Sequence, residues 1–510
     1  MPTWNLPTER PSLQAARIKL PAELTASIRV GATQLAMMGD QSQHKCREGN
    51  LEYTLDEHRH RLLGDEKTGE SIPSFKPTSR RGSTRALLDG RNNGYSPKKI
   101  LFAPATYNLA ETTRMLDIAR GVSRHEFAKD IFEVYFLSEG GQFERLIEKE
   151  GYTLKRSGPP LTDEKIAHIY AVNDEEKIGT IFTRQELVTK VTGDVASLKE
   201  LQPIAVITGS NLSVPVACQI TGTPLVWIVQ STWFEEFFAS GAGVTDGIRF
   251  APLKRIADFF VYIGIEFWMW YGFIRPVNAA AKHFDVKEYK PVFNFFKGDI
   301  TLVAEPSGFS GIPLPENHFY VGPLLANQDF PIPDEVRNIP RDMPLVYFAM
   351  GSSGTATVVA QIIESFKGAP YRVIAPVKQL IKTKPDLEVP PNVLVTDWLP
   401  ALQVSKMADI SVIHGGIGTV MTAALAGKPV VGVGMQPEQR ANIACLERKG
   451  FAVRLSKSKD LPKRLQEAIR SQLSNSEAKR KAEEYSMEMA KWNGPHNAAD
   501  ILYQKFGKAD

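Results

Sequence analysis

The chain has 510 residues, which is too long for one compact core and suits two domains with extensions. With 43% hydrophobic and 23% charged residues, its composition is that of an ordinary soluble globular protein. The formal net charge is only +4 and no dense basic block stands in the regular part of the chain, which argues against nucleic-acid binding. Three widely separated cysteines, Cys46, Cys218 and Cys445, fit neither a disulfide framework nor a zinc site and favour a reducing compartment.

Residues 1–97 differ from the rest of the sequence. They are rich in Ser, Pro, Gly, Arg and charge, so we expect a low-complexity, disordered extension that holds at most a short helix over 20–38. The first residues lack a basic start followed by an apolar run, so no secretory signal is expected. These features favour a cytoplasmic protein.

From Lys99 onward, short apolar strands alternate with helices. Strands are predicted at KKILFAPA, FEVYFLS, IAVITGS and PLVWIV, and helices at AETTRMLDIARGV, FERLIEKEG and VPVACQITG, the last of which ends at Gly222. Strands that alternate with helices in this way are joined by right-handed crossovers and form a parallel sheet.

The same alternation restarts after a Pro-rich passage, which we interpret as a linker at 326–342. Further strands are predicted at PLVYFAM, YRVIAP, NVLVTDW, ISVIHGG and PVVGVG, with helices at TVVAQIIESFKG and GTVMTAALAG. The predicted fold class is α/β, with two Rossmann-like, doubly wound domains at 98–325 and 343–485 facing each other across a cleft. A ligand is expected at the carboxyl ends of the strands, where both sheets open.

The motif HGGIGT, residues 414–419, follows a predicted strand and opens a predicted helix. Its glycines let the backbone turn tightly and approach a ligand closely. The free N–H groups and the dipole of a helix start suit a diphosphate, and His414 can donate to a phosphate oxygen. A Gly-rich turn is a weak signal by itself, because many strand-to-helix turns use glycine for shape.

Three neighbouring strand ends add polar and aromatic groups to this motif. Trp398 follows one strand and could stack on a flat base, although core packing is the alternative. Glu438 and Gln439 follow another strand and offer a carboxylate and an amide to sugar hydroxyls, the alternative being a solvated loop pair. Ser352 and Ser353, after the first strand of this half, offer a second phosphate nest. Four strand ends therefore predict a nucleotide-sugar site.

The block from Trp398 to Asn442 resembles the signature of the UDP-glycosyltransferase family with the GT-B fold, the group of natural-product and bacterial antibiotic glycosyltransferases. The resemblance covers about residues 98–506. The matching residues are Trp398, Pro400, His414, Gly415, Gly416, Gly418, Thr419, Pro429, Glu438, Gln439 and Asn442.

The resemblance implies a role for each part of this block. Trp398 would stack on the base, His414 to Thr419 would hold the diphosphate together with Ser352 and Ser353, and Glu438 and Gln439 would bind the sugar. It also implies that a C-terminal helix at 486–510 returns to the N-terminal, acceptor-binding domain. Two positions depart from the family pattern: Thr422 stands where plant members have a ribose-binding glutamate, and Ala401 replaces a glutamine.

An inverting transfer needs a base for the acceptor's proton and groups that stabilise the leaving diphosphate. In the family the base is usually a histidine after the first strand, paired with an aspartate. Here Glu111 stands at the histidine's place and Gly209 at the aspartate's, so the usual dyad is absent. We predict Glu111 as the base, the alternative being a favourable first-turn carboxylate. Asn108 and Thr112 could orient the acceptor or the carboxylate.

Two histidines, His125 and His168, are weaker candidates for the base because each lies in a polar helical context typical of exposed residues. No metal is required if helix N–H groups and His414 stabilise the leaving group. The only co-substrate expected is a nucleotide sugar, a UDP-sugar before others, and no further cofactor.

Residues 226–274 are unusually aromatic, and too many of these side chains fall outside one helical stripe for core packing alone. We predict a large hydrophobic acceptor pocket for a polyketide, terpenoid, sterol or other lipid-like alcohol. The residues expected to bind the acceptor are Asn108, Trp227, Trp233 and Phe234. The stretch 259–274 is too short for a spanning helix and carries a glutamate near its middle, but part of this surface is expected to contact a membrane.

The predicted function is metal-independent transfer, with inversion, of a hexose-type sugar from UDP or dTDP to a hydroxyl of a hydrophobic acceptor. One alternative is a sugar-nucleotide epimerase or phosphorylase of the same architecture, which needs no separate apolar acceptor pocket. The other is a catalytically silent auxiliary partner of a true transferase.

Overall fold

The computed structural model describes residues 96–508 apart from 174–176, 242, 244, 246, 247, 326–330 and 351–355. The expected extension therefore lies almost wholly outside the described residues, together with the short helix over 20–38. Ser352 and Ser353 lie outside them as well.

The first parallel sheet follows from the apolar strands of the N-terminal half. Within the described residues it has seven strands in the order β3-β2-β1-β4-β5-β6-β7, and each neighbouring pair is parallel. Its strands are β1 (Lys98–Phe102), β2 (Phe132–Ser138), β3 (Thr153–Arg156), β4 (Ala205–Thr208), β5 (Leu225–Val229), β6 (Ile300–Val303) and β7 (His318–Tyr320).

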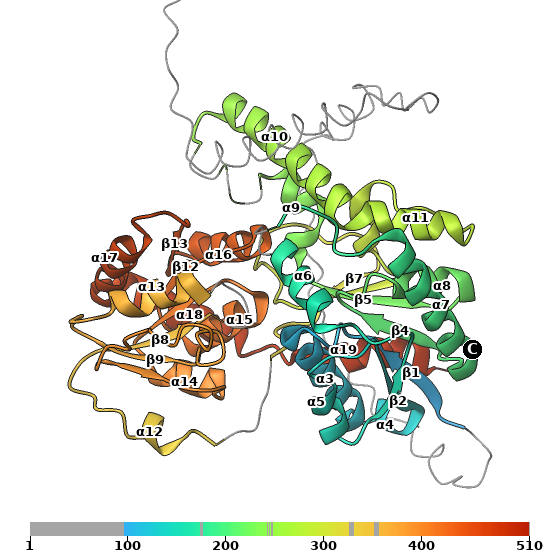
Figure 1. The fold of residues 1–510 in the computed structure, drawn as a ribbon, viewed down its shortest axis with the longest axis horizontal. Helices are drawn as coiled ribbons and strands as arrows, with labels where there is room; N and C mark the ends of the chain where they lie inside the picture. The colour runs from blue at the N-terminus through green and yellow to red at the C-terminus, as the bar shows by residue number, and fades with distance from the viewer. Residues whose placement is uncertain are drawn as a thin grey trace, which may run out of the picture. The chain divides into compact units, whose positions relative to one another are not determined.

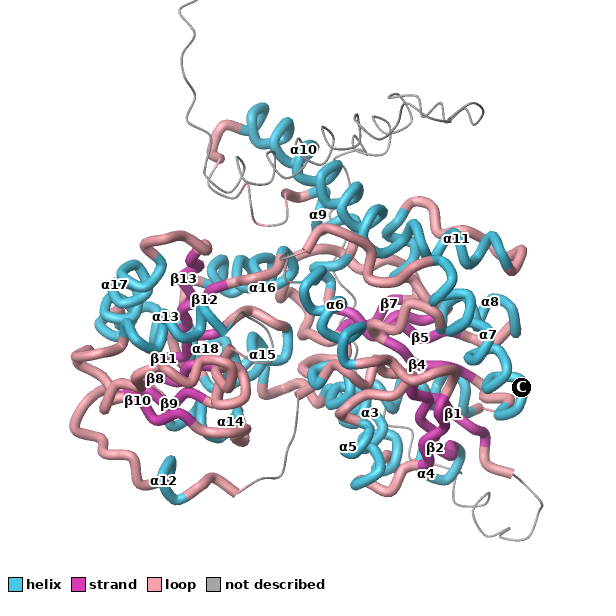
Figure 2. Tube along the Cα trace, in the orientation of Figure 1, coloured by secondary structure: helices cyan, strands magenta, loops and turns pink. Residues whose placement is uncertain are grey.

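Helices cover both faces of this sheet (Figures 1 and 2). Ile100 and Phe102 of β1 pack in one cluster with α3 and α19, whereas Leu101 and Ala103 pack in another with α7 and α8. Successive residues of a strand point to opposite faces, so a continuous apolar run such as KKILFA is what a sheet buried on both faces requires. The helices of this half are α3 (Leu109–Arg124), α4 (Ala128–Ile131), α5 (Glu144–Lys149), α6 (Asp163–Asn173), α7 (Arg184–Leu201), α8 (Val214–Thr221), α9 (Glu235–Ala239), α10 (Ala251–Met269) and α11 (Arg275–His283).

Three short helical turns complete this half: η2 (Ser231–Trp233), η3 (Trp270–Ile274) and η4 (Val292–Phe296). The predicted end of the helix VPVACQIT is confirmed, because Gly222 caps α8 in the left-handed conformation with a φ of 68°. None of the helices in the described part of the chain combines the length and the apolar composition that crossing a bilayer requires.

The second sheet is also parallel and, in the described part, has six strands in the order β10-β9-β8-β11-β12-β13. They are β8 (Leu345–Ala349), β9 (Arg372–Ala375), β10 (Val393–Val395), β11 (Ile410–Ile413), β12 (Val430–Val433) and β13 (Ala452–Leu455). The helices are α12 (Asp334–Arg337), α13 (Ala356–Ser365), α14 (Ala401–Met407), α15 (Ile417–Ala426), α16 (Pro437–Lys449), α17 (Leu461–Ser474), α18 (Ser476–Met489) and α19 (Gly494–Leu502), followed by the turn η5 (Tyr503–Gly507).

Both sheets are doubly wound, which confirms the predicted α/β fold class. Strand order reverses between β1 and β4 in the first sheet and between β8 and β11 in the second. Such a switch point opens a crevice beyond the carboxyl ends of the strands, where ligands of this fold bind. The C-terminal helix α19 packs against α3, the helix that follows β1.

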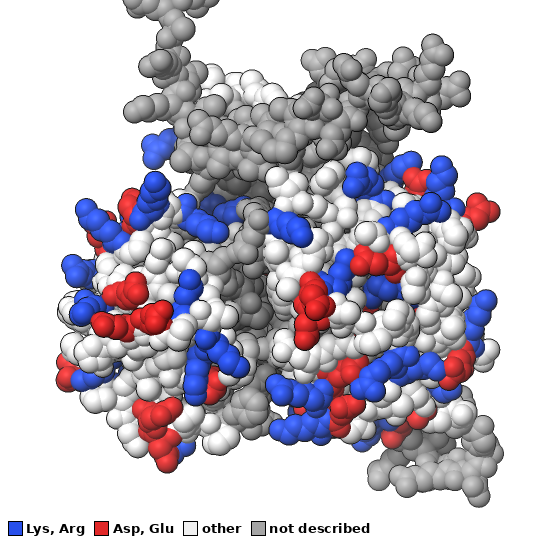
Figure 3. Space-filling view, in the orientation of Figure 1, with Lys and Arg blue, Asp and Glu red and all other residues white. Residues whose placement is uncertain are grey.

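Charged side chains of both signs are interspersed on the face seen in Figure 3, without a field of one sign. This mixture agrees with the formal net charge of +4.

Candidate active site

One cavity of about 490 Å³ is lined by residues that follow strands of both sheets. Its volume is in the range of small-molecule sites. From the first sheet it is lined by segments after β1, β4 and β5, and from the second by segments after β10, β11 and β12. The two switch points therefore contribute to the same cavity.

The Gly-rich turn after β11 forms one wall of this cavity. Gly416 is the N-cap of α15, and the first N–H groups of a helix have no partner within the helix. Gly415 has a φ of +92°, and a Cβ there would lie 2.5 Å from the Gln439 carbonyl oxygen, so only glycine fits. Gly416, Gly418 and Thr419 line the cavity, which is the arrangement of a helix N-terminus open to an anion.

Two buried polar side chains hold this turn from behind. The Asn442 amide donates to the Gly415 carbonyl at 3.0 Å, and its oxygen accepts from the Thr232 hydroxyl at 2.9 Å. Thr232 lies in η2, directly after β5 of the first sheet. The Gly-rich turn is thus connected to the N-terminal half by hydrogen bonds through Asn442.

His414 lines the cavity at the start of the turn. Its Nδ1 lies 3.4 Å from the Ala349 carbonyl oxygen, and burial lowers the pKa of the imidazole to about 4. When Nδ1–H donates to that carbonyl, the neutral ring has no hydrogen on Nε2. Donation from Nε2 to a phosphate therefore needs a protonated ring, whose charge the diphosphate would stabilise.

We expect His414→Ala to weaken binding of a nucleotide sugar by about ten- to a hundredfold, because a hydrogen bond to a charged group contributes roughly 1.5–3 kcal/mol. In the wild type, binding should tighten as the pH falls from neutrality toward about 4, the pKa of the unliganded histidine, since the bound diphosphate raises that pKa. Isothermal titration calorimetry measures both effects. His168→Ala is the matched control, and a pH-independent wild-type affinity would contradict protonation of His414.

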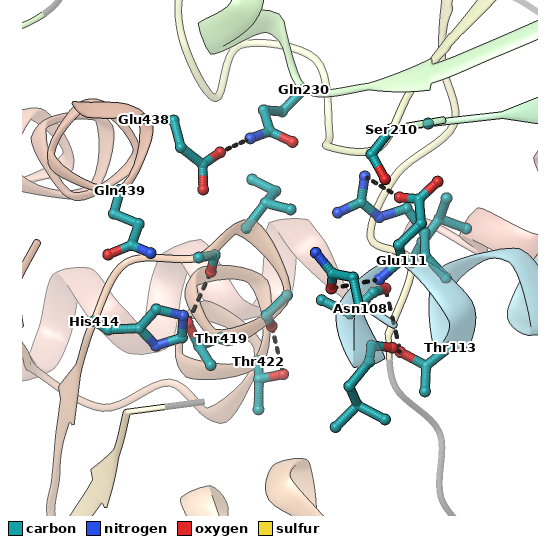
Figure 4. A pocket seen from close by; sticks show the side chains of 18 of the residues that line it. Asn108, Glu111, Thr113, Ser210, Gln230, His414, Thr419, Thr422, Glu438 and Gln439 are labelled. Carbon is teal, nitrogen blue, oxygen red and sulfur yellow. Dashed lines mark hydrogen bonds and ion pairs between the residues drawn. The ribbon is translucent and has the colours of Figure 1, made fainter. Parts of the chain in front are cut away.

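Glu438, which the sequence predicts to bind the sugar, lies at the start of α16. Burial raises the pKa of this carboxyl, and the nearby Arg114 guanidinium and hydrogen bonds from Trp233 and Gln230 counteract part of the shift. Figure 4 shows Gln230, from the end of β5, pointing toward Glu438, to which its amide donates. Glu438 is therefore held by donors from the other half.

Gln439 lies beside Glu438 but is committed to the helix start. Its side-chain oxygen accepts from the backbone N–H groups of Met435 and Gln436 at 3.0 and 3.3 Å, as part of a capping box. Gln439 also lines the cavity. Its carbonyl positions α16, so a contact with the sugar would have to come from its amide group.

Trp398 lines the cavity after β10, with 39% of its surface exposed. Core packing, the alternative interpretation, does not describe such a side chain, and an indole face is available to a base. Thr422, at the position where plant relatives have a ribose-binding glutamate, donates to the Gly418 carbonyl of its own helix at 2.7 Å.

Glu111 lies in the first turn of α3, where Asn108 caps the helix by accepting from the Glu111 N–H at 3.3 Å. Its carboxylate lines the cavity and its side chain is only 4% exposed. Burial raises its pKa, and Arg114, whose Nη1 lies 4.0 Å from Glu111 Oε2, lowers it together with the Gly209 and Ser210 N–H groups. Among the described residues, Glu111 Oε1 has no hydrogen-bond partner.

Gly209, which stands at the position of the family aspartate, makes room for this carboxylate. A Cβ at 209 would lie 2.6 Å from Glu111 Oε1 and 2.8 Å from Oε2. Ser210 stands beside the Glu111 carboxylate (Figure 4). Its hydroxyl is also buried without a partner in the described part of the chain. Two uncommitted oxygens thus lie together at the carboxyl ends of β1 and β4.

The aromatic stretch 226–274 divides between three environments. Trp227, Trp233 and Trp268 line the cavity, although Trp227 is fully buried against Phe295 and Phe296. A second group is buried in the core and does not line the cavity: Phe234, Phe237, Phe238 and Tyr262. A third group is exposed on α10 and just after it: Phe259, Phe260 and Trp270.

Other predicted residues are placed as follows. Asn108 lines the cavity, whereas Phe234 packs with Val229 and Val303 behind its wall. His125 stacks on His496 with ring centroids 5.0 Å apart, and His168 bonds the Thr180 carbonyl at 2.9 Å, both outside the cavity lining.

Arg114, Ser210, Gln230 and Thr232 carry contacts that the sequence did not single out. Arg114 follows Glu111 at helical spacing, and Gln230 follows a buried strand, so spacing and strand-end rules could have found both. Among the described residues no group of three or more His, Cys, Asp or Glu side chains is placed to hold a metal ion.

Residues 373–504 match the family described as erythromycin biosynthesis protein CIII-like, C-terminal domain. A PGL/p-HBAD biosynthesis glycosyltransferase of Mycobacterium tuberculosis is 26% identical over 412 residues, which cover 77% of this chain and 90% of that protein. A PGL/p-HBAD biosynthesis rhamnosyltransferase of Mycobacterium bovis is 26% identical over 315 residues, 60% of this chain and 68% of that protein.

Solved structures show the same fold. The spinosyn forosaminyltransferase SpnP superposes with a TM-score of 0.58 at 15% identity, covering 81% of this chain and 100% of that one. The glycosyltransferase VinC, solved in complex with dTDP, gives a TM-score of 0.54 at 18% identity, with 81% and 100% covered.

The fold is therefore GT-B, and the homologues that the chain resembles support a glycosyltransferase. The family match over 373–504 and the relatives at 26% identity support the resemblance to the UDP-glycosyltransferase family of natural-product type that the sequence shows.

Proposed function

We propose that the protein transfers a hexose-type sugar from a UDP- or dTDP-sugar to a hydroxyl group of a hydrophobic acceptor, with inversion at the anomeric carbon. One observation carries the proposal. The buried Glu111 carboxylate, with its uncommitted oxygen, lines the same cavity as the His414–Gly416 turn and the start of α15.

In this mechanism Glu111 takes the proton of the acceptor hydroxyl as the acceptor oxygen attacks the anomeric carbon. The bond from that carbon to the diphosphate oxygen breaks on the opposite face, so a single displacement inverts the configuration. The diphosphate leaves with the bonding electron pair. Its charge is stabilised by the N–H groups at the start of α15 and by His414.

Polar atoms at the cavity wall support this placement of the acceptor. Among the described residues, three buried atoms without hydrogen-bond partners belong to cavity-lining side chains: Glu111 Oε1, Ser210 Oγ and Trp227 Nε1. Buried polar atoms normally have partners, so orphaned ones mark a place where a ligand hydroxyl or water belongs.

The remaining wall favours an apolar acceptor such as a polyketide, terpenoid or sterol. Apolar and aromatic side chains of the N-terminal half form it: Tyr107, Tyr170, Ile181, Leu212, Trp268 and Phe273. The dTDP in the VinC structure belongs to that protein, and the presence of a similar fold here supports testing dTDP- beside UDP-sugars.

We expect purified protein to glycosylate hydrophobic alcohols and to leave small polar acceptors unmodified. The experiment incubates UDP- and dTDP-hexoses with both kinds of acceptor and identifies products by mass spectrometry. Proton couplings of the product's anomeric position show whether the configuration is inverted. Turnover of small polar acceptors alone would contradict the apolar pocket. Donor epimerisation without transfer would favour the epimerase, and nucleotide-sugar binding without any turnover would favour the auxiliary partner.

A further inference from the structure

Helix α10 presents an apolar ridge to solvent. We call Leu253, Ile256, Phe259, Phe260 and Ile263 the α10 ridge; their exposed fractions are 42, 56, 38, 60 and 41%. Four of them recur at steps of three and four residues, so they share one face of the helix. Large apolar side chains gathered on one exposed face indicate an interaction surface rather than scattered surface hydrophobics.

The opposite face of α10 is fixed to the N-terminal half. Ala257, Tyr262 and Met269 are buried, and the Tyr262 ring packs on Phe293 with centroids 5.6 Å apart. The Tyr262 hydroxyl donates to Glu235 at 3.1 Å. The ridge is therefore held outward by a packed helix that continues through η3 into α11 (Figure 1).

Basic and aromatic residues flank the ridge at both ends. Arg249 and Arg255 are exposed at its N-terminal end, whereas the acidic Asp258 is neutralised by Lys254 at 2.9 Å. At the other end, Arg275 lies over the Tyr271 ring, with its guanidinium carbon 4.6 Å from the centroid. Apolar residues framed by arginine and by interfacial aromatic rings are complementary to an anionic lipid surface.

The helix that carries the ridge also contributes to the cavity wall. Trp268 lies at the C-terminal end of α10 and Phe273 in the turn that follows, and both line the cavity wall. The helix that carries the ridge therefore also contributes, through its C-terminal end, to the wall of the cavity.

We propose that the α10 ridge docks on an anionic lipid surface, from which a membrane-dissolved acceptor enters the cavity past Trp268. The docking is a property of the helix itself, whereas the acceptor's route rests on the function proposed above.

The test is co-sedimentation of the full-length protein with vesicles of phosphatidylcholine, with and without phosphatidylserine. Binding should be stronger to the vesicles that contain phosphatidylserine and should weaken with salt. Phe260→Glu is expected to lower binding about tenfold or more, because it removes an exposed phenylalanine that the lipid would bury and places a negative charge at the lipid surface. Arg255→Glu should abolish only the preference for anionic vesicles.

Met487→Glu is the matched control, since Met487 is 68% exposed on α18, away from the ridge. It should bind vesicles like the wild type, and Phe260→Glu should keep wild-type turnover with an acceptor dispersed in solution. The proposal is overturned if the wild type does not bind vesicles, or if Phe260→Glu and Met487→Glu lower vesicle binding equally. Self-association that Phe260→Glu abolishes, without lipid binding, identifies a second copy as the occupant instead. Vesicle binding is measured without turnover, so failure of the proposed transferase activity gives a separate result.

Discussion

Replacing Glu111 by Gln is expected to lower kcat by about a hundredfold or more, the usual contribution of a positioned general base. Glutamine has nearly the same shape as glutamate, but its amide cannot take the acceptor's proton. In the proposed mechanism the donor binds to the other half, around α15 and Glu438, so nucleotide-sugar affinity should stay at the wild-type value. Steady-state kinetics and calorimetry of the same preparation measure the two quantities.

The pH profile provides a second readout of the same residue. Glu111 acts as a base only when it is ionised, and burial raises its pKa above the ordinary value of 4.5. Wild-type kcat/KM should therefore fall as the pH is lowered through this raised pKa, and the residual activity of the variant should lack that limb. Asp117→Asn, a carboxyl-to-amide change at another buried position of α3, is the control. Wild-type turnover in Glu111→Gln refutes the assignment.

Gly209→Ala should impair catalysis about a hundredfold without replacing any reacting group, because small displacements of a catalytic group have effects of that size. The new Cβ would lie 2.6 Å from Glu111 Oε1 and 2.8 Å from the Ile228 carbonyl oxygen, so the carboxylate must move. Kinetics of the single and double variants test this account. The double variant Glu111→Gln with Gly209→Ala should be no slower than Glu111→Gln alone, since both changes remove the same function, proton transfer to the Glu111 carboxylate.

Gly264→Ala controls for the general effect of an added methyl group. Nothing lies within 4 Å of a Cβ at this helical glycine, so turnover should remain within about twofold of the wild type. Multiplied losses in the double variant would show that Gly209→Ala acts on something other than the Glu111 carboxylate. Thermal unfolding of each variant separates a displaced carboxylate from a damaged fold.

The sheets could be predicted from the sequence because their strands are short, apolar runs bounded by turns. FEVYFLS corresponds residue for residue to β2, Phe132–Ser138. The meeting of Glu111 with Gly209, and of the His414 turn with Glu438, follows from the rule that parallel strands end at one edge. Topology alone therefore brings residues far apart in sequence into one cavity.

Contacts between the two halves could not be predicted in this way. The bond from Gln230 to Glu438 depends on how two sheets are docked, and no periodicity within either one encodes that. The aromatic stretch 226–274 shows a related problem, because period and composition do not distinguish the buried Phe234 from the exposed Phe260. Gln439 is a third case: its capping role depends on the precise start of α16.

The short segment Gln230–Trp233 belongs by sequence to the N-terminal half, and Ser231 bonds Glu305 of that half, but the other three side chains of the segment make polar contacts with the C-terminal half. Gln230 and Trp233 donate hydrogen bonds to Glu438. Thr232 donates to Asn442, which in turn donates to the Gly415 carbonyl of the Gly-rich turn. Chimaeras that exchange the N-terminal halves of related proteins at the interdomain linker would separate the segment Gln230–Trp233 from its partners in the C-terminal half. A recombined enzyme should instead inherit this four-residue segment from the same parent as α15 and α16, so that the crossover follows the contacts rather than the domain boundary.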